Sequence, residues 1–436
     1  MEDAVDVTRS LRPTSWLPFM AWGLLVLMQL ISPDKVWSWL LVGLSVLLAV
    51  SVYWAIMLRD HINAERRVEG TWVVAGDEIR ELFRLTNDGA LPVLWARIED
   101  QSAVPGYRVD RVETVGPHSV RSWTGSGVCQ RRGVFRLGPW NLVTADPLGL
   151  FEVRHHYPFT TTIMVYPRAS FLPNIELPRG RAAGRAASSE RAAMETILVG
   201  GVREYAPGDS LRRVHWHASA HHDRLMVREF DREPSGDVWL VVDLEDAVQA
   251  GKGAEATQEY SVVVAASLAS LFTKHGERRA VGLLMSGRTP AYVPPARGQA
   301  QLWRILRSLA EAEPAPGVSL RSLLEQAGPS LGSGRTLVLI TPSQSADWVA
   351  PLLPLVSRGN APTAVLLDAT SFDPPAGNEN AFVGLRGLLS QQRIPSYVVA
   401  QGFPFRPMER IRRQREELKI LPGTGRVIRV EVEEEV

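Results

Sequence analysis

Two long uncharged apolar runs near the N-terminus constrain this chain more than any other feature. They cover residues 13–33 and 36–58, and only Asp34 and Lys35 separate them. Each run has about the 20 residues that an α-helix needs to cross the hydrocarbon core of a bilayer. The sequence therefore predicts a transmembrane helical hairpin over residues 14–58, which anchors the protein in a lipid bilayer. A buried core hairpin of a soluble protein is the alternative.

Charges on the two sides of these runs predict the orientation of the hairpin. Basic residues before and after it are Arg9, Arg12, Arg59, Arg66 and Arg67. Lys and Arg are retained on the cytoplasmic side of membrane proteins. We therefore expect a multi-pass protein of the inner (plasma) membrane, with a cytoplasmic N-terminus over residues 1–13 and with both termini and the soluble domains in the cytoplasm. A cleaved signal peptide does not fit, because no small-residue cleavage site follows Ile31 and the second run comes at once.

Composition excludes several other classes of protein. The 436 residues are too many for one ordinary domain, and a net charge of +1 gives no reason to expect a nucleic-acid partner. Cys129 is the single cysteine, so an intramolecular disulfide is excluded. The glycine-containing stretch at residues 332–336 lacks the Lys of a phosphate loop. We expect no cofactor.

Short runs rich in β-branched and aromatic residues follow the hairpin. They predict a small β-sandwich-like domain over residues 59–168. The turn at residues 87–89 (Asn-Asp-Gly) indicates a β-hairpin within it. His155 and His156 come at the end of a predicted strand, where we expect exposed edge residues rather than metal ligands.

Strands and helices alternate from Gly236 onward. Apolar runs at 237–244, 279–286, 336–342, 361–368 and 395–400 are separated by helical segments such as 258–274. This alternation predicts a parallel, doubly wound α/β domain over residues 236–422, closed by an amphipathic helix at 408–418. Residues 423–436 are predicted to form an acidic C-terminal tail.

Such sheets hold ligands at the carboxyl ends of their strands, where Asp243, Glu245 and Asp246 follow the first predicted strand. A von Willebrand factor A-like domain has Asp-x-Ser-x-Ser here, and its carboxylate and hydroxyls bind Mg²⁺. This chain has Asp243, Glu245 and Ala247 at the matching positions. The metal site is therefore degenerate, and we expect no bound metal.

A charged segment between the two domains, within residues 169–235, is the other candidate site. The residues singled out in it are Arg203, Glu204, Tyr205, Pro207, Gly208, Asp209, Arg212, Trp216, Arg228 and Glu229. Charges of both signs at close spacing favour mutual ion pairs over a catalytic pair. We expect a structural joint in which Trp216 is buried and Arg212 and Arg228 pair with carboxylates.

Four histidines in the same segment leave a second interpretation open. They are His215, His217, His221 and His222. His217 and His221 have the i,i+4 spacing that holds Zn²⁺ on a helix, but the Glu of a metalloprotease motif is absent. Whether these histidines bind metal or sense pH stays open at this stage.

The same segment resembles a known family. REYAPGD, LRRVHW, ASA and LMVREF (within 203–230) resemble the hallmark of the bacterial domain of unknown function 58, and residues 131–151 and 165–168 resemble its upstream strands. The resemblance implies a β-rich region, a von Willebrand factor A-like domain and a membrane anchor. Family members have basic residues where this chain has His217 and His221.

The function that this resemblance implies is that of an adaptor. Genes of the family neighbour those of MoxR-type AAA+ ATPases, which makes such an ATPase the expected protein partner. We expect a membrane-anchored, non-enzymatic adaptor or scaffold that works with this ATPase in the assembly or regulation of envelope-associated proteins. The alternatives are a metal-dependent hydrolase that uses Asp243 or the histidines, and a ligand or lipid sensor of the envelope.

Overall fold

The chain folds into two compact units, one of residues 1–168 with 409–436 and one of residues 169–408. A computed structural model describes residues 7–172, 175, 199–205, 214–222, 224–230, 237–274, 279–373, 379–407, 412–420 and 427–435. We call the first unit the β unit and the second the α/β unit. The mixed α/β architecture with several sheets is confirmed.

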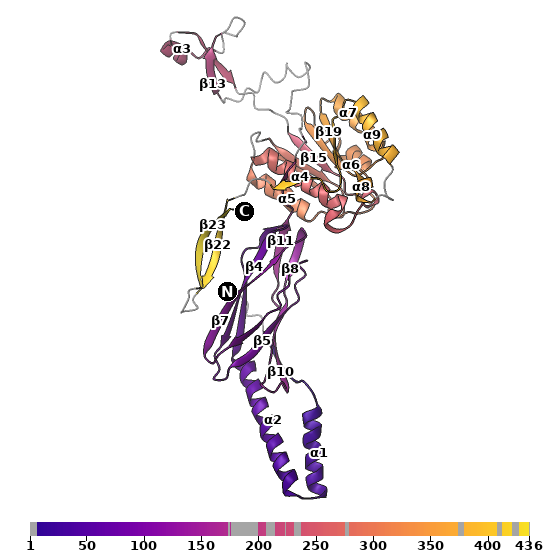
Figure 1. Cartoon of the computed structure of the whole chain (residues 1–436). Helices are drawn as coiled ribbons and strands as arrows, with labels where there is room; N and C mark the ends of the chain where they lie inside the picture. Colours follow the sequence, from indigo (N-terminus) through magenta and orange to yellow (C-terminus); the bar gives the residue numbers. More distant parts are fainter. Residues whose placement is uncertain are drawn as a thin grey trace. The chain divides into compact units, whose positions relative to one another are not determined.

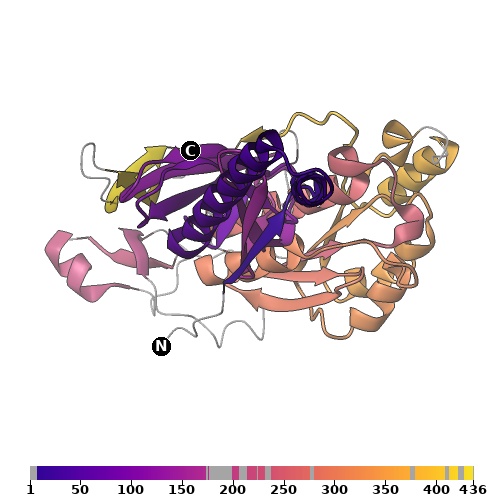
Figure 2. The same ribbon diagram turned by 90° about the horizontal axis from the view of Figure 1, so that it is seen from below.

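Two apolar helices open the β unit and lie side by side (Figures 1 and 2). They are α1 (Leu17–Ile31) and α2 (Lys35–His61). Of the described helices, α2 alone is both long and apolar enough to cross a membrane. The Asp34 side chain caps α2 by accepting a hydrogen bond from the Val36 amide. α2 runs directly into strand β2, which begins at Ile62.

Antiparallel strands make up most of the β unit. They are β1 (Thr8–Pro13), β2 (Ile62–Val68), β3 (Trp72–Val74), β4 (Glu78–Asn87), β5 (Val93–Asp100), β6 (Val112–Val115), β7 (Ser119–Val128), β8 (Gly133–Leu137), β9 (Trp140–Ala145), β10 (Phe151–Tyr157) and β11 (Thr161–Tyr166). Three sheets result, with the strand orders β1-β10-β9-β5-β6, β2-β4-β7 and β3-β11-β8. One core of buried residues from all three sheets also takes in Ala55 and Leu58 of α2. The base of α2 is therefore part of the β unit's core.

The β unit departs from the sequence prediction at two backbone positions. The N-terminal segment was predicted only to be cytoplasmic, with no strand in it, but Thr8–Pro13 forms β1 and pairs with β10. The turn at residues 87–89 does not join a hairpin, because β4 pairs with β2 and β7 while β5 pairs with β6 and β9. The side-chain amide of Asn87 donates to the backbone carbonyl oxygens of Leu91 and Gly116, both at 2.9 Å. These hydrogen bonds direct the chain from one sheet into the next.

His155 corrects a further prediction. It was expected at an exposed edge, but its side chain is 1% exposed, because β10 is an interior strand between β1 and β9. The missed strand β1 covers what would have been a sheet edge. Neither ring nitrogen of His155 has a hydrogen-bond partner. Burial lowers the pKa of His155 to about 4, so the ring is neutral at pH 7.

A six-stranded sheet forms the centre of the α/β unit. Its strands are β15 (Val238–Val242), β16 (Val281–Met285), β17 (Ala291–Ala296), β18 (Thr336–Thr341), β19 (Ala361–Leu367) and β20 (Ser396–Val399). The order is β17-β16-β15-β18-β19-β20, and β17 alone of these strands runs antiparallel to its neighbour. The apolar runs predicted as parallel strands are therefore present as strands in one sheet.

Helices cover both faces of this sheet. The helices of the unit are α3 (Trp216–His222), α4 (Thr257–Lys274), α5 (Gln299–Ala310), α6 (Leu320–Ala327), α7 (Leu352–Ser357), α8 (Ala369–Phe372) and α9 (Glu379–Gln391), with the short 3-10 helices η3 (Asp246–Val248), η4 (Gly253–Glu255) and η5 (Asp347–Val349). Buried residues of α6, α7 and α9 pack on Trp239, Val241 and Leu339. Successive strand residues point to opposite faces, and α4 contacts β15, β16, β18 and β19. Since α4 is absent from that core cluster, we place it on the other face.

Four short strands and a C-terminal pair complete the described strands. β12 (Ser170–Phe171) pairs with β21 (Arg406–Pro407), and β13 (Val199–Glu204) pairs with β14 (Met226–Phe230). The helix predicted at 408–418 is wrong where the chain is described, because β22 (Arg412–Ile420) pairs antiparallel with β23 (Val427–Glu435). The segment predicted as an acidic tail alternates apolar and charged residues, which is the pattern of a strand. Arg412 lies opposite Glu435 and Arg413 opposite Glu434. The pair belongs to the β unit.

Candidate functional site

The candidate site lies at the carboxyl ends of the central strands of the α/β unit. From β15 the chain goes to β16 and β17 on one side of the sheet, and then crosses to β18 on the other side. Parallel sheets bind ligands where the strand order reverses in this way. We call the segments that follow β15, β16 and β18 here, residues 243–248, 286–288 and 341–347, the carboxyl edge.

Asp243, the predicted remnant of a metal site, is buried at this edge and is 0% exposed. Its Oδ2 accepts a 2.6 Å hydrogen bond from the hydroxyl of Thr341, at the end of β18. Its Oδ1 accepts a 3.2 Å hydrogen bond from the amide of Glu245. Burial raises the pKa of Asp243 to about 6, although both hydrogen bonds act to lower it. Each carboxylate oxygen therefore already has a donor from the protein.

Further hydrogen bonds fix the loop after β15. The side-chain amide of Gln249 donates to the backbone carbonyl oxygens of Asp243 and Glu245, each at 3.2 Å. The Leu244 amide donates to the Ser286 hydroxyl at 2.8 Å, which joins the loops after β15 and β16. The backbone around Asp243 is therefore held by Gln249 from the same loop and by Ser286 from the loop after β16.

The rim of the carboxyl edge is acidic. Asp246 and Asp347 are exposed, and Glu245 is half-buried. The nearby Arg288 is paired with Glu313 at 3.2 Å, so its charge is balanced. Three carboxylates therefore face the solvent side of the edge around the buried Asp243. Such a rim attracts a basic surface rather than an anion.

The residues of this edge do not fit a divalent cation. In the part of the chain that the structure describes, no group of three or more His, Cys, Asp or Glu side chains is arranged to hold a metal ion. The side chain of Ala247 has no ligand atom, and the hydroxyl of Thr341 donates its hydrogen bond to Asp243. Thr341 is the residue that the sequence analysis missed. It ends β18 and lies next to the last residue of the predicted strand 336–342, so the rule that found Asp243 could have found it too.

The hallmark segment folds into a small module of β13, α3 and β14. The Met226 amide donates to the Ser219 hydroxyl at 2.8 Å, and the His215 amide donates to the Met226 carbonyl at 2.7 Å. Val214 and Val227 form a bridge and are 4% and 3% exposed. Met226–Phe230 form β14, and the bridged Val214 lies before α3, which ends at His222.

Trp216 is not buried as the sequence analysis expected. It is 68% exposed among the described residues, because the inward positions of this module are taken by Val214 and Val227. Glu204 forms a 3.5 Å ion pair with Arg224 between largely exposed side chains. Tyr205 is half-buried, and its amide donates to the Leu225 carbonyl at 2.8 Å.

The other hallmark residues are described in part or not at all. Pro207, Gly208, Asp209 and Arg212 lie outside the described residues. Arg203 is placed on β13, and Arg228 and Glu229 on β14, by their backbone alone. The expected ion pairs of Arg212 and Arg228 therefore stay a prediction.

The histidines of the segment do not converge on one point within the described region. His215 Nδ1 accepts a 3.1 Å hydrogen bond from the Ala218 amide and so caps α3. His217 and His221 are exposed, and the side chain of His222 lies outside the description. The ring centroids of His215 and His217 are 6.5 Å apart in an edge-on arrangement. The zinc interpretation gains no support from these positions.

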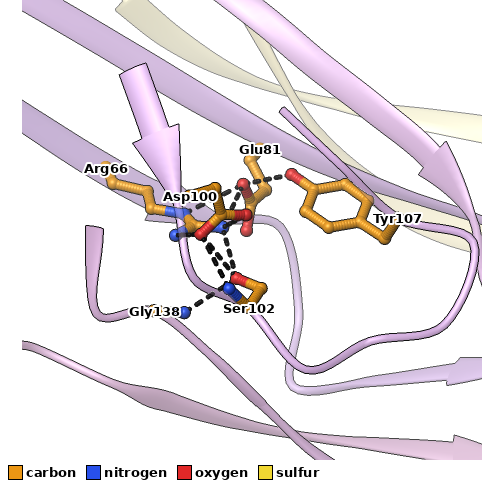
Figure 3. Close-up of polar contacts among 6 residues, drawn as sticks. All are labelled: Arg66, Glu81, Asp100, Ser102, Tyr107 and Gly138. Carbon is orange, nitrogen blue, oxygen red and sulfur yellow. Dashed lines mark hydrogen bonds and ion pairs between the residues drawn. The ribbon is translucent and has the colours of Figure 1, made fainter. Parts of the chain in front are cut away.

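A buried charge cluster in the β unit was not foreseen from the sequence (Figure 3). The Arg66 guanidinium donates to Glu81 at 3.0 Å and to both oxygens of Asp100 at 2.9 and 3.1 Å. These side chains are 6%, 0% and 1% exposed. The Tyr107 hydroxyl also donates to Glu81, and the Ser102 hydroxyl donates to Asp100 at 2.6 Å. Burial raises the pKa of Glu81 against the opposing effect of Arg66.

This cluster joins three strands and a loop of the β unit. Arg66 comes from β2, Glu81 from β4 and Asp100 from β5, and Tyr107 lies in the loop that follows. The sequence analysis counted Arg66 as a charge that flanks the membrane helices. The structure corrects this, because the Arg66 guanidinium is buried inside the β unit and is bonded to Glu81 and Asp100.

The fold and the site together define a class of protein with two units. One is a β-rich unit that is continuous with an apolar helix. The other is an α/β unit with a buried aspartate at the point where the strand order of its sheet reverses. Residues 201–364 match the family described as "Protein of unknown function DUF58". The assignment of residues 201–364 to this family, which the resemblance in the hallmark segment indicated, is thus supported.

Relatives in two bacteria support this assignment. YeaD of Bacillus subtilis is 28% identical over 57% of this chain and 62% of its own length. Rv1480 of Mycobacterium tuberculosis is 25% identical over 40% of this chain and 56% of its own length. The chain thus matches about three fifths of the length of these relatives. The CARDB domain of PF1109 from Pyrococcus furiosus is 11% identical, covers 24% of this chain and 94% of that chain, and has a TM-score of 0.18. That score is too low to carry an argument.

Proposed function

We propose that this protein is a membrane-anchored, non-enzymatic adaptor that binds a protein partner through the carboxyl edge of its α/β unit. The observation that carries the proposal is the state of Asp243. Its carboxylate is buried and bonded to Thr341 and to the Glu245 amide, while Asp246 and Asp347 on the rim are exposed. A buried, hydrogen-bonded carboxylate with exposed acidic side chains around it suits recognition of a basic protein surface.

Exposed apolar side chains on both N-terminal helices support the anchor. Trp16, Leu17, Leu30 and Ile31 are each at least 68% exposed around α1, and Trp39 of α2 is 74% exposed. Apolar surface of this extent is not left in water by soluble proteins. The pair acts as a two-helix transmembrane hairpin, in which α1 is the shorter member.

The orientation is proposed from the basic residues on the two sides of the helices, of which Arg59 is paired with Asp60 at 2.8 Å. Arg9 and Arg12 lie before the helices and Arg59 lies at the end of α2, whereas only Lys35 lies between the helices. The positive-inside rule then keeps both units in the cytoplasm, at the inner (plasma) membrane. A reporter fused after Val436 that is active only in the periplasm would contradict this orientation.

The partner is suggested by the family resemblance together with the acidic rim. The strand order of the α/β unit and its switch point support the proposal that this unit is a von Willebrand factor A-like domain with a degenerate metal site. The neighbouring genes of the family make a MoxR-type AAA+ ATPase the expected partner. Carboxylates on the rim would steer a basic patch of this ATPase and make the complex sensitive to salt.

The experiment is a pull-down of the tagged full chain from native membranes at low salt. We expect the ATPase to be captured by the unchanged chain and lost with the double variant Asp246→Lys/Asp347→Lys. Glu325→Lys is the matched control, since Glu325 lies on α6 and is 51% exposed. The adaptor proposal fails if no ATPase is captured by the unchanged chain. It also fails if the purified chain hydrolyses peptides or glycans with added metal, which the hydrolase alternative requires.

A further inference from the structure

We propose that the turn Asp146–Leu150, here called the tip turn, lies in the interfacial layer of the bilayer beside the start of α1. The β unit would then be seated on the membrane by a third contact besides its two helices. This inference rests on the membrane anchor of the proposed function. Its ligand is a lipid surface.

The tip turn is tied to the segment that enters α1. The Thr14 amide donates a 2.9 Å hydrogen bond to the Leu150 carbonyl. Pro13 lies opposite Phe151 in the pairing of β1 with β10. The Phe19 ring of α1 packs edge-on against the Phe151 ring, with their centroids 5.9 Å apart. The depth of the tip turn is therefore fixed by the depth of the first turn of α1.

The tip turn is built rigidly and points an apolar side chain outward. Asp146 is 1% exposed and accepts hydrogen bonds from the amides of Leu148 at 3.0 Å and Phe151 at 2.7 Å. Gly149 takes a φ of 67°, which allows the tight reversal. Leu148 is 55% exposed at the apex. A buried carboxylate thus holds a solvent-facing leucine in place.

Helix lengths bring this leucine to the membrane boundary. α1 has 15 residues, which at about 1.5 Å per residue reach about 22 Å, whereas the hydrocarbon core is about 30 Å thick. α2 has 27 residues and is long enough by itself. α1 is therefore about 8 Å shorter than the core is thick, so with the Ser32–Asp34 connection at the far interface the start of α1 lies no farther out than the near interface. The tip turn is carried inward with it.

Aromatic side chains mark the same level on both helices. Trp16 at the start of α1 is 69% exposed and Tyr53 of α2 is 55% exposed. Such rings favour the membrane interface. Beyond Tyr53, residues of α2 are buried in the core of the β unit, since Ala55 is 0% and Leu58 is 2% exposed. The boundary between lipid contact and protein contact on α2 therefore lies beside Tyr53.

The experiment measures the depth of a fluorophore in the full chain, reconstituted in lipid nanodiscs. Single cysteines at Leu148→Cys, Leu40→Cys and Glu78→Cys are labelled with the environment-sensitive dye NBD. Leu40 is 50% exposed and lies about 8 Å along α2 from its start at Lys35, and Glu78 begins β4 at the end opposite the residue that pairs with Ile62. Cys129 is buried, so the unsubstituted chain gives the labelling blank. Nitroxide lipids with the quencher at a shallow or a deep position report the depth of the dye.

We expect the dye at position 148 to be quenched at least threefold more by shallow than by deep nitroxide lipids. The dye at position 40 should be quenched most by deep nitroxides and the dye at 78 by neither. If position 148 behaves as position 78 does while position 40 is quenched, the tip-turn inference is wrong and the membrane anchor stands. If position 40 is not quenched either, the anchor itself fails.

Discussion

The Thr341 hydroxyl donates a 2.6 Å hydrogen bond to Asp243 Oδ2 and so joins the ends of the two central strands, β18 and β15. The Thr341 oxygen in turn accepts a 2.9 Å hydrogen bond from the Ser343 amide. A neutral donor thus meets a buried carboxylate where the strand order of the sheet reverses. The geometry around Asp243 is consistent with a structural centre inside a recognition surface.

Removal of the Thr341 hydroxyl should weaken the centre of the sheet. Thr341→Val leaves Asp243 Oδ2 without its donor in a buried place, and we expect a loss of about 1–3 kcal/mol of stability in the α/β unit. Thr341→Ser keeps a donor and should cost less. Hydrogen exchange of the β15 amides measures this. Equal protection in the two variants would show that the hydrogen bond contributes nothing.

Asp243 should make the α/β unit more stable at acidic pH. Its pKa is raised in the folded state to about 6 from an ordinary 3.8, so its contribution is fully present below pH 3.8 and is lost as the pH rises through about 6. Asp243→Asn removes this dependence and should stabilise the unit at pH 7.5 by about 2–3 kcal/mol. The exposed Asp246→Asn is the control and should change stability by less than about 0.5 kcal/mol. Hydrogen exchange of β15 at pH 5 and 7.5, corrected for intrinsic rates, distinguishes these outcomes.

His155 should give the β unit the opposite dependence on pH. Its pKa is lowered in the folded state to about 4 from 6.5. The unfolded chain therefore binds the proton more readily, and stability present above pH 6.5 is lost as the pH falls towards 4. The full loss is about 3 kcal/mol. His155→Leu should abolish it, whereas His156→Leu should retain it, since His156 contacts Asn141 on the other side of β10.

The readout for the β unit is the reactivity of Cys129. This cysteine is 0% exposed in the core of the unit, and burial raises its pKa to about 11. Its thiol is therefore inert until the β unit unfolds. The chain is equilibrated in urea and detergent at each pH and then given a short labelling pulse at one fixed pH. An unfolding midpoint that does not change between pH 7 and 5 would contradict the role of His155.

The buried charge cluster should be costly to break. Arg66→Met leaves the Glu81 and Asp100 carboxylates facing each other in the core, and we expect a loss of about 3–5 kcal/mol. Arg67→Met is the matched control on the same strand. Arg67 pairs with Glu65, and these side chains are 64% and 56% exposed, so the loss should be under about 1 kcal/mol. The same Cys129 assay compares the two variants, and equal losses would contradict the account of the cluster.

Patterns along the chain predicted the α/β sheet well because its strands are nearly continuous apolar runs. The run at 237–244, for example, contains β15, whose residues are all buried. The carboxyl-edge position of Asp243 followed from the same pattern. Thr341 was missed because its role depends on Asp243, which lies 98 positions earlier in the sequence.

Contacts that are distant in sequence account for the failures in the β unit. His155 becomes interior only because Thr8–Pro13 pairs with β10, and no local pattern announces that pairing. Arg66 is buried because Glu81 and Asp100 come from other strands. Trp216 was expected to be buried because the segment was predicted to be a structural joint between the two domains, but it is 68% exposed among the described residues. The side-chain pairing of the hallmark charges stays a prediction.

The rate of complex formation tests the central claim most directly. The purified full chain in nanodiscs is mixed with a MoxR-type ATPase from the same organism, and association is followed at low and high salt. We predict fast association at low salt that falls as salt rises, and a decrease of about tenfold for Asp246→Lys with little change in dissociation, because exposed rim charges act on encounter rates. Glu325→Lys should behave as the unchanged chain. No association at low salt, or an association rate that neither salt nor Asp246→Lys alters, would contradict the adaptor account.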